Sequence, residues 1–330
     1  MRTPKITRQN LEKSQVLIYL TAIIAGLLAG FSRPGLGAVL EPLLWPVLGL
    51  LLYATFTQTS LSKIPGAFRD RRFIGTALAG NFLAIPLIVL GFVTLLPGHG
   101  AIRLGVALVL LVPCTDWFIT FTRLGRGDAE RAIAFSPLSL LFQIPLLPVY
   151  LFLFFGDELT VSLATGGMVR AFLGIIVAPL LLAWLTEKWV DAAPAQRRVV
   201  HSGLGWMPVP LLAAVIFMIA ASQSHVIFHA GSLLVYPAIC FIAFLAIAPL
   251  LAKVLSGAAS LPVRQGRTLA FSFGSRNSFV VLPLALALPE AYEIAVFVVV
   301  LQSLIELFGM AAYVWLVPNV LFRQAKNPCV

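Results

Sequence analysis

A long run without any formal charge is the feature that most constrains this chain. Residues 199–252 contain no Lys, Arg, Asp or Glu. One helix that crosses a bilayer needs about 20 mostly apolar residues, so this run can hold two spans and the turn between them. Soluble domains carry about 25% charged residues, whereas only 11% of this chain of 330 residues is charged. We therefore predict an all-α polytopic membrane protein.

Apolar runs of span length alternate with Gly, Pro and charged residues that are typical of turns. One such turn is Gly156-Asp157-Glu158. The pattern predicts ten transmembrane helices, over residues 15–31, 38–57, 73–95, 103–122, 133–155, 168–186, 205–222, 231–252, 267–288 and 293–318.

The distribution of Lys and Arg predicts how these helices are oriented. Nineteen of the 23 basic residues lie in the two terminal tails and in or at the edge of the loops after the second, fourth, sixth and eighth spans. Only three lie in or at the edge of the other loops, and Arg276 lies deep inside a span. Short cytoplasmic loops carry an excess of Lys and Arg. We therefore expect a multi-pass protein of the inner cell membrane with both termini in the cytoplasm. Because its basic residues are spread over short loops, the net charge of +10 does not indicate a nucleic-acid partner.

Ten spans with cytoplasmic termini allow two inverted halves of five helices each, a plan common in secondary transporters. We place these halves at residues 1–156 and 157–330. A weak internal similarity supports them, because Gln143 and Gln302 occupy the middle of the fifth and tenth spans and a Tyr follows each of them further along.

Three ionisable residues lie inside predicted spans: Asp116, Arg276 and Glu306. Each costs about 2.5–3.5 kcal/mol at the bilayer centre, and such residues face the bundle interior or a water-filled cavity. Asp116 and Arg276 can form a buried ion pair that locks two helices together, or they can contact a solute. Glu306 is the expected site of proton coupling, with Asp116 as a second candidate. The alternative is that Gln302, one turn earlier, only holds a neutral Glu306 in place.

Helix-breaking residues interrupt the fourth and ninth spans at mid-depth. Pro113 lacks a backbone donor, and residues 272–278 are mostly small or polar, with Gly274 among them and Pro283 following. Free backbone groups are tolerated in a bilayer where they line a cavity. We predict two discontinuous helices that line a solute site, with contacts from Cys114, Thr115, Asp116, Ser275, Arg276, Asn277 and Ser278.

The cysteines do not form a metal-binding pattern, since Cys114, Cys240 and Cys329 are scattered along the chain. We predict no metal site and no cofactor. Cys240 lies in a uniformly apolar span and suits packing. Cys114 follows a helix-breaking Pro, so its thiol can either pack or face the cavity, where soft sulfur ligands suit thiophilic solutes.

Several of these segments resemble the arsenical-resistance permeases of the bile acid:sodium symporter superfamily. The similar segments are Pro113-Cys114-Thr115, Leu124-Gly125-Arg126-Gly127-Asp128, FSFGSRNSFVVLPLALALP at 271–289 and Ile305-Glu306-Leu307. The resemblance implies ten helices in two inverted repeats, arranged as a panel and a core domain. It also implies that the discontinuous helices 4 and 9 cross at the substrate site.

The resemblance implies efflux of arsenite or antimonite by proton antiport, with Cys114 binding the metalloid and Glu306 coupling the proton. Asp116 and Arg276 place charges where these permeases are mostly uncharged. An anionic solute could therefore pair with Arg276. A sodium- or proton-coupled carrier of an organic anion is therefore the alternative function. A membrane enzyme or a sensor is disfavoured because the chain has no nucleotide loop, nucleophile–base pair or soluble domain.

Overall fold

Helices form the regular structure of the described part of the chain. The computed structural model describes residues 8–33, 35–58, 70–96, 98–115, 117–163, 172–192, 199, 203–222 and 233–323. The chain divides into two compact units, Met1–Gln58 with Gly166–Ser232, and Thr59–Thr165 with Leu233–Val330. Each unit combines segments of both predicted halves, so the units are not the repeats, and the repeat boundary stays a prediction.

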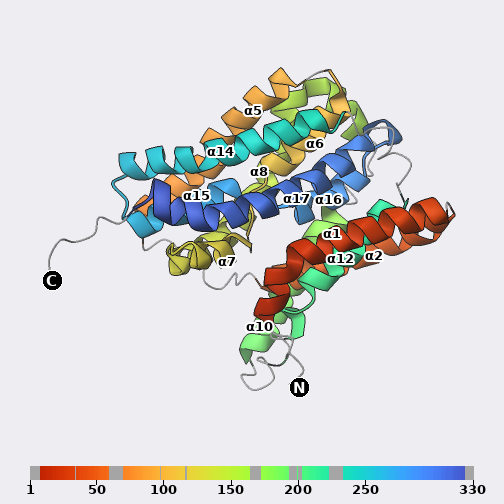
Figure 1. Ribbon diagram of the computed structural model, residues 1–330, viewed down its shortest axis with the longest axis horizontal. Coiled ribbons are helices and arrows are strands. Elements are labelled where there is room, and N and C mark those ends of the chain that lie inside the picture. The colour runs from red at the N-terminus through yellow and green to blue at the C-terminus, as the bar shows by residue number, and fades with distance from the viewer. Residues whose placement is uncertain are drawn as a thin grey trace. The chain divides into compact units, whose positions relative to one another are not determined.

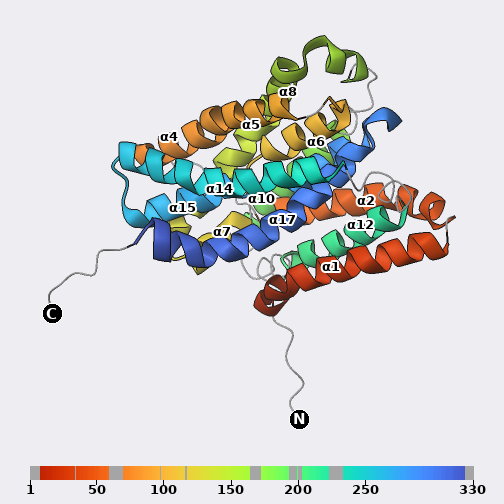
Figure 2. The same ribbon diagram turned by 45° about the horizontal axis from the view of Figure 1, so that its top comes forward.

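The first unit is a layer of closely packed helices. They are α1 (Arg8–Ser32), α2 (Leu36–Phe56), α10 (Ala178–Ala192), which continues the π-helical segment η3 (Phe172–Val177), and α12 (Pro208–Ser222). Helices α1 and α12 lie side by side (Figures 1 and 2). They approach so closely at Gly26 that an added Cβ would lie 2.5 Å from the carbonyl oxygen of Phe217. A small residue at this place allows the backbones to pack without a side chain between them.

The second unit holds the remaining helices. They are α4 (Arg71–Ala79), η2 (Gly80–Ala84), α5 (Ile85–Leu95), α6 (Gly100–Leu110), α7 (Trp117–Leu124), α8 (Ala129–Leu163), α14 (Val235–Ala258), α15 (Val263–Gly274), α16 (Ser278–Leu286), η4 (Glu290–Tyr292), α17 (Ile294–Leu316) and η5 (Val317–Leu321). Helix α14 lies beside α15 and α17 (Figures 1 and 2).

Five helical stretches in the described residues are long and apolar enough to cross a bilayer. They are Leu36–Phe56, Arg71–Leu95, Ala129–Gly156, Val235–Ala258 and Glu290–Leu321. Their outward surface is apolar as well, since large side chains such as Leu87 and Ile242 are 70% and 61% exposed. The prediction of an all-helical polytopic membrane protein is confirmed. The count of ten spans and their orientation stay predictions.

The structure interrupts helices where the sequence indicates breaks. In the fourth predicted span α6 ends at Leu110 and α7 begins at Trp117, and in the ninth α15 ends at Gly274 and α16 begins at Ser278. Pro283, in contrast, lies inside α16, so the interruption covers residues 275–277 only. Helix α8 kinks at Gly156, whose φ of 54° is a left-handed value that glycine adopts without a steric penalty.

Candidate functional site

The two helix breaks of the second unit meet each other. Pro113 and Arg276 form an isolated antiparallel β-bridge. Its backbone bonds run from the N–H of Cys114 to the carbonyl of Ser275, at 3.1 Å, and from the N–H of Asn277 to the carbonyl of Val112, at 2.8 Å. Each break therefore supplies hydrogen-bond partners for backbone groups that the other break leaves without an intrahelical partner. Buried backbone groups need such partners in an apolar environment. We call residues 112–115 and 275–277 the crossing.

Arg276 has its guanidinium group enclosed by neutral oxygens. Its side chain is buried, and Nη2 donates to Asn81 Oδ1 at 2.9 Å and to the carbonyls of Ser272 and Phe273 at 2.9 and 2.7 Å. Nη1 donates to the carbonyl of Leu110 at 3.3 Å. Hydrogen bonds that involve a charged group are about twice as strong as neutral ones. The charge is thus compensated by dipoles from the ends of α6 and α15 and from η2.

Asn81 belongs to this cluster although the sequence analysis did not select it. It lies in the π-helical turn η2, and turns of this type are frequent at functional sites. Its Nδ2 donates to the carbonyl of Ala77 and to Ser272 Oγ, at 3.1 and 3.0 Å. The preceding Gly80 lets η2 approach α15, because a Cβ there would lie 1.9 Å from the ring of Phe273. A Gly-Asn pair inside the apolar run 73–95 was the available signal.

Glu306 connects α17 to the crossing. Its Oε2 accepts the backbone N–H of Arg276 at 2.8 Å and Nε2 of Gln302 at 2.5 Å. Gln302 in turn accepts the hydroxyl of Ser278 at 2.6 Å. All these side chains are buried. The carboxyl group therefore binds the same segment, 275–277, whose other edge pairs with Cys114.

The remaining predicted residues surround the same place. Asn277 caps α16 by accepting the N–H of Val280 at 3.3 Å, and its Nδ2 lies 3.5 Å from Thr115 Oγ1. Cys114 is buried and lies next to Pro113 of the bridge. The structure thus brings together Pro113, Cys114, Thr115, Gly274, Ser275, Arg276, Asn277, Ser278 and Glu306. Asp116 lies outside the described residues, so its pairing with Arg276 stays a prediction.

Helix α8 adds a buried polar face, of which only Gln143 was singled out from the sequence. Ser136 donates its hydroxyl to the carbonyl of Thr115. Ser139 and Gln143 follow at helical spacing, are buried, and make no side-chain hydrogen bond within the described part of the chain. Residues three and seven positions apart share one helix face. The spacing of 136, 139 and 143 was the signal for this face.

The crossing can solvate a small polar solute. Its residues carry hydroxyl, amide and guanidinium groups and one thiol, and the carboxyl group of Glu306 lies against it. Among the described residues no cluster of three or more His, Cys, Asp or Glu side chains could hold a metal ion.

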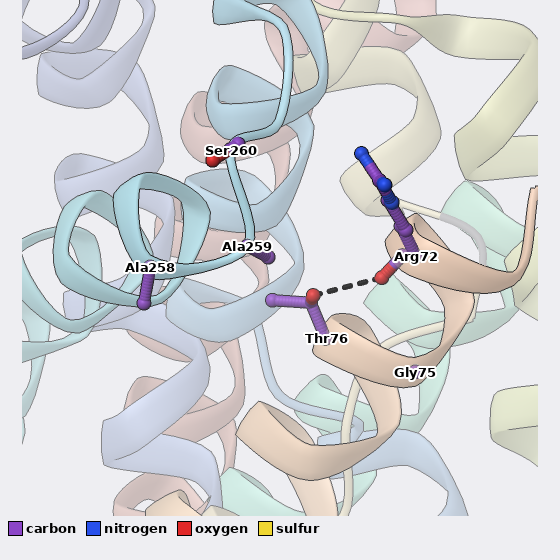
Figure 3. A pocket seen from close by; sticks show the side chains of 6 residues that line it. All are labelled: Arg72, Gly75, Thr76, Ala258, Ala259 and Ser260. Carbon is purple, nitrogen blue, oxygen red and sulfur yellow. Dashed lines mark hydrogen bonds between the residues drawn. The ribbon is translucent and has the colours of Figure 1, made fainter.

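A separate pocket of ≈ 540 Å³ lies between α4 and the residues at the end of α14 (Figure 3). Among the described residues, Arg72 is the one charged side chain that lines it, and Thr76 donates its hydroxyl to the Arg72 carbonyl at 2.8 Å. No residue of the crossing lines this pocket, so we do not assign it to the candidate site.

Comparison with protein families agrees with this architecture. Residues 45–230 match the model of the Sodium Bile acid symporter family, and this range includes α6, α7 and Cys114. No curated protein matches the chain at a significant level. The match covers more than half of the chain, which therefore belongs to the Sodium Bile acid symporter family, a family of membrane transporters and not of enzymes.

Proposed function

We propose that this transporter exports trivalent arsenic or antimony in exchange for protons. The observation that carries the proposal is that the backbone of Cys114 and the carboxyl group of Glu306 both bind one short segment, residues 275–277. Ser275 accepts the N–H of Cys114, and the next N–H, that of Arg276, is donated to Glu306. A secondary transporter must couple solute binding to ion binding, and here the two groups act on adjacent backbone positions.

Arsenite suits the polar groups of the crossing because it is an uncharged hydroxide near neutral pH. The sulfur of Cys114 supplies the soft ligand that a thiophilic metalloid prefers. Thr115, Asn277 and Ser278 supply hydroxyl and amide groups for its OH groups. The Nη atoms of Arg276 donate four hydrogen bonds to neutral oxygens, so the charge is already solvated by the protein without an anionic solute.

Glu306 suits proton coupling because its two recorded hydrogen bonds depend on its charge state. An ionised carboxylate accepts the N–H groups of Arg276 and Gln302. A protonated carboxyl group is a weaker acceptor, since bonds to an ionised acceptor are roughly twice as strong. Protonation would therefore weaken the attachment of α17 to segment 275–277. This would in turn alter the position of Ser275, whose carbonyl accepts the N–H of Cys114.

The transport plan that goes with this mechanism has ten spans in two inverted repeats, 1–156 and 157–330, in the cytoplasmic membrane with both termini inside. The broken helices support it, because they occupy the fourth and ninth places and so correspond in the two halves. Reporter fusions after the second, fourth, sixth and eighth spans should read cytoplasmic, and those after the odd-numbered spans external. Two adjacent reversed fusions would contradict the plan.

Carriage of an organic anion with sodium is the second candidate. The family description names sodium and bile acid, and a buried guanidinium at the crossing favours negative charge nearby. This candidate predicts uptake that follows a sodium gradient and tolerates the loss of the Cys114 thiol.

Transport by everted membrane vesicles tests both candidates in one experiment. Vesicles with and without the protein are energised by an imposed proton gradient, then by a sodium gradient, and are given arsenite or a bile acid. We expect arsenite accumulation with the proton gradient only. Bile-acid transport that needs sodium, with no arsenite transport, would instead support the second candidate.

A further inference from the structure

An arginine in left-handed conformation marks the turn between α7 and α8. The N–H of Gly127 bonds to the carbonyl of Thr122 at 2.8 Å, and the N–H of Arg126 bonds to that of Arg123 at 3.2 Å. These two bonds define a Schellman motif, in which the residue at the position of Arg126 is left-handed and is usually glycine. Arg126 has a φ of 57°. Non-glycine residues held this way cluster at functional sites.

The turn forms one wall of a basic pocket of ≈ 340 Å³. Gly127 and Ala129 line it together with four arginines. Arg123 and Arg126 come from the turn region, and Arg264 and Arg267 come from the first turns of α15. The walls are tightly joined, because the N–H of Asp128 bonds to Thr268 Oγ1 at 2.8 Å. We call this site the arginine pocket.

The positive charges of the arginine pocket are not neutralised by the described residues. Arg267 is buried and donates only to carbonyl oxygens, those of Phe322 and Arg126. None of the four arginines forms an ion pair within the described part of the chain. The nearest acid in sequence, Asp128, accepts the N–H of Arg131 and so caps α8. Arg264 likewise donates to a carbonyl, that of Gly127 at 3.5 Å. An anion would thus meet four guanidinium groups that form no ion pair with the described residues.

We propose that the arginine pocket binds a phosphate group. Guanidinium groups match phosphate geometry and bind it in a bidentate manner. Two sources are possible chemically: an anionic phospholipid headgroup, or inorganic phosphate. Basic pockets between the ends of membrane helices bind anionic headgroups. The apolar side chains beside the pocket favour this source, since Leu124 and Val263 are 50% and 37% exposed and can contact the acyl chains. The site is independent of the transported solute.

The test compares single arginine variants of the purified full-length protein in detergent, where no charged membrane surface is present. Native mass spectrometry counts bound phosphatidylglycerol and phosphatidylcholine, and thermal shift measures binding of inorganic phosphate against sodium chloride at equal ionic strength. Arg264→Gln removes an exposed lining arginine. Arg72→Gln is the matched control, because Arg72 is exposed on the same unit and lines a pocket with no second charged side chain (Figure 3).

An ion pair between an exposed arginine and an anionic headgroup contributes up to about fivefold in affinity. We therefore expect Arg264→Gln to weaken phosphatidylglycerol binding by up to about fivefold, the double variant Arg123→Gln/Arg264→Gln by up to about 30-fold, and Arg72→Gln less than twofold. A phosphate-specific thermal shift without lipid selectivity would assign the pocket to free phosphate. Equal binding of both lipids together with no phosphate effect would overturn the proposal, as would an equal loss in Arg72→Gln and Arg264→Gln.

Discussion

Asn81→Leu should destabilise the second unit far more than the same change at an exposed position. Asn81 accepts from the Arg276 guanidinium at 2.9 Å and donates to Ser272 Oγ at 3.0 Å, and both bonds join η2 to the broken ninth helix. A bond to a charged group is worth about 1.5–3 kcal/mol, and a neutral bond between membrane helices about 0.6–1.7 kcal/mol. Leucine has a similar size, so the expected loss in the free energy of unfolding is about 3 kcal/mol.

The assay is reversible unfolding of the purified protein in mixed micelles by increasing fractions of sodium dodecyl sulfate. Asn319→Leu is the control, since Asn319 is exposed in the same unit and its side chain bonds to the carbonyl of Trp315, four positions earlier in the chain. It should change stability by less than about 0.5 kcal/mol. Asn81→Asp keeps an acceptor for the guanidinium and should recover most of the loss. Equal stability of Asn81→Leu and Asn319→Leu would refute the role given to the oxygens around Arg276.

Three further predictions follow from the packing and charge of the crossing. Gly80→Ala should lower the melting temperature, because its Cβ would overlap the buried ring of Phe273 and overpacking costs about 1–3 kcal/mol, whereas Gly75→Ala, with nothing within 4 Å, should not. Reversing Asp116 and Arg276 together should recover folding or transport that each single reversal loses, because a lone buried charge costs several kcal/mol; no rescue would show that the two act separately. Glu306→Gln should abolish accumulation driven by a proton gradient and spare exchange of labelled solute; normal accumulation would exclude Glu306 as the coupling group.

The helix breaks could be predicted from sequence because their causes are local. Pro113 lacks a donor, and Gly274 with the polar residues after it is a poor lipid-facing helix. These features act within one turn of the chain. The sequence also indicated that Arg276 and Glu306 need polar surroundings, because charge is costly in a bilayer. Gln302, expected beside Glu306 because it lies one turn earlier, does bond to its carboxyl group.

The other partners of these residues could not be predicted, because they come from distant segments. Asn81 reaches Arg276 across 195 positions of the chain, and it does so from a π-helical turn that no composition rule marks. Glu306 accepts the backbone N–H of Arg276, whereas the only partner within the chain that the sequence suggested for Arg276 was Asp116, as an ion pair with the Arg276 side chain. Pro283 shows the opposite error: proline favours a helix break, yet α16 continues through it from Ser278 to Leu286.

Arsenite efflux by a pair of cysteine variants tests the central claim most directly. Cys114 is buried on the crossing, whereas Cys240 is partly exposed in α14 and is not one of the crossing residues. Everted vesicles carrying Cys114→Ser or Cys240→Ser are compared at equal protein content under the same proton gradient. The account predicts normal arsenite accumulation for Cys240→Ser and none for Cys114→Ser. Normal accumulation by Cys114→Ser would contradict thiol coordination at the crossing, and with it the proposed metalloid transport.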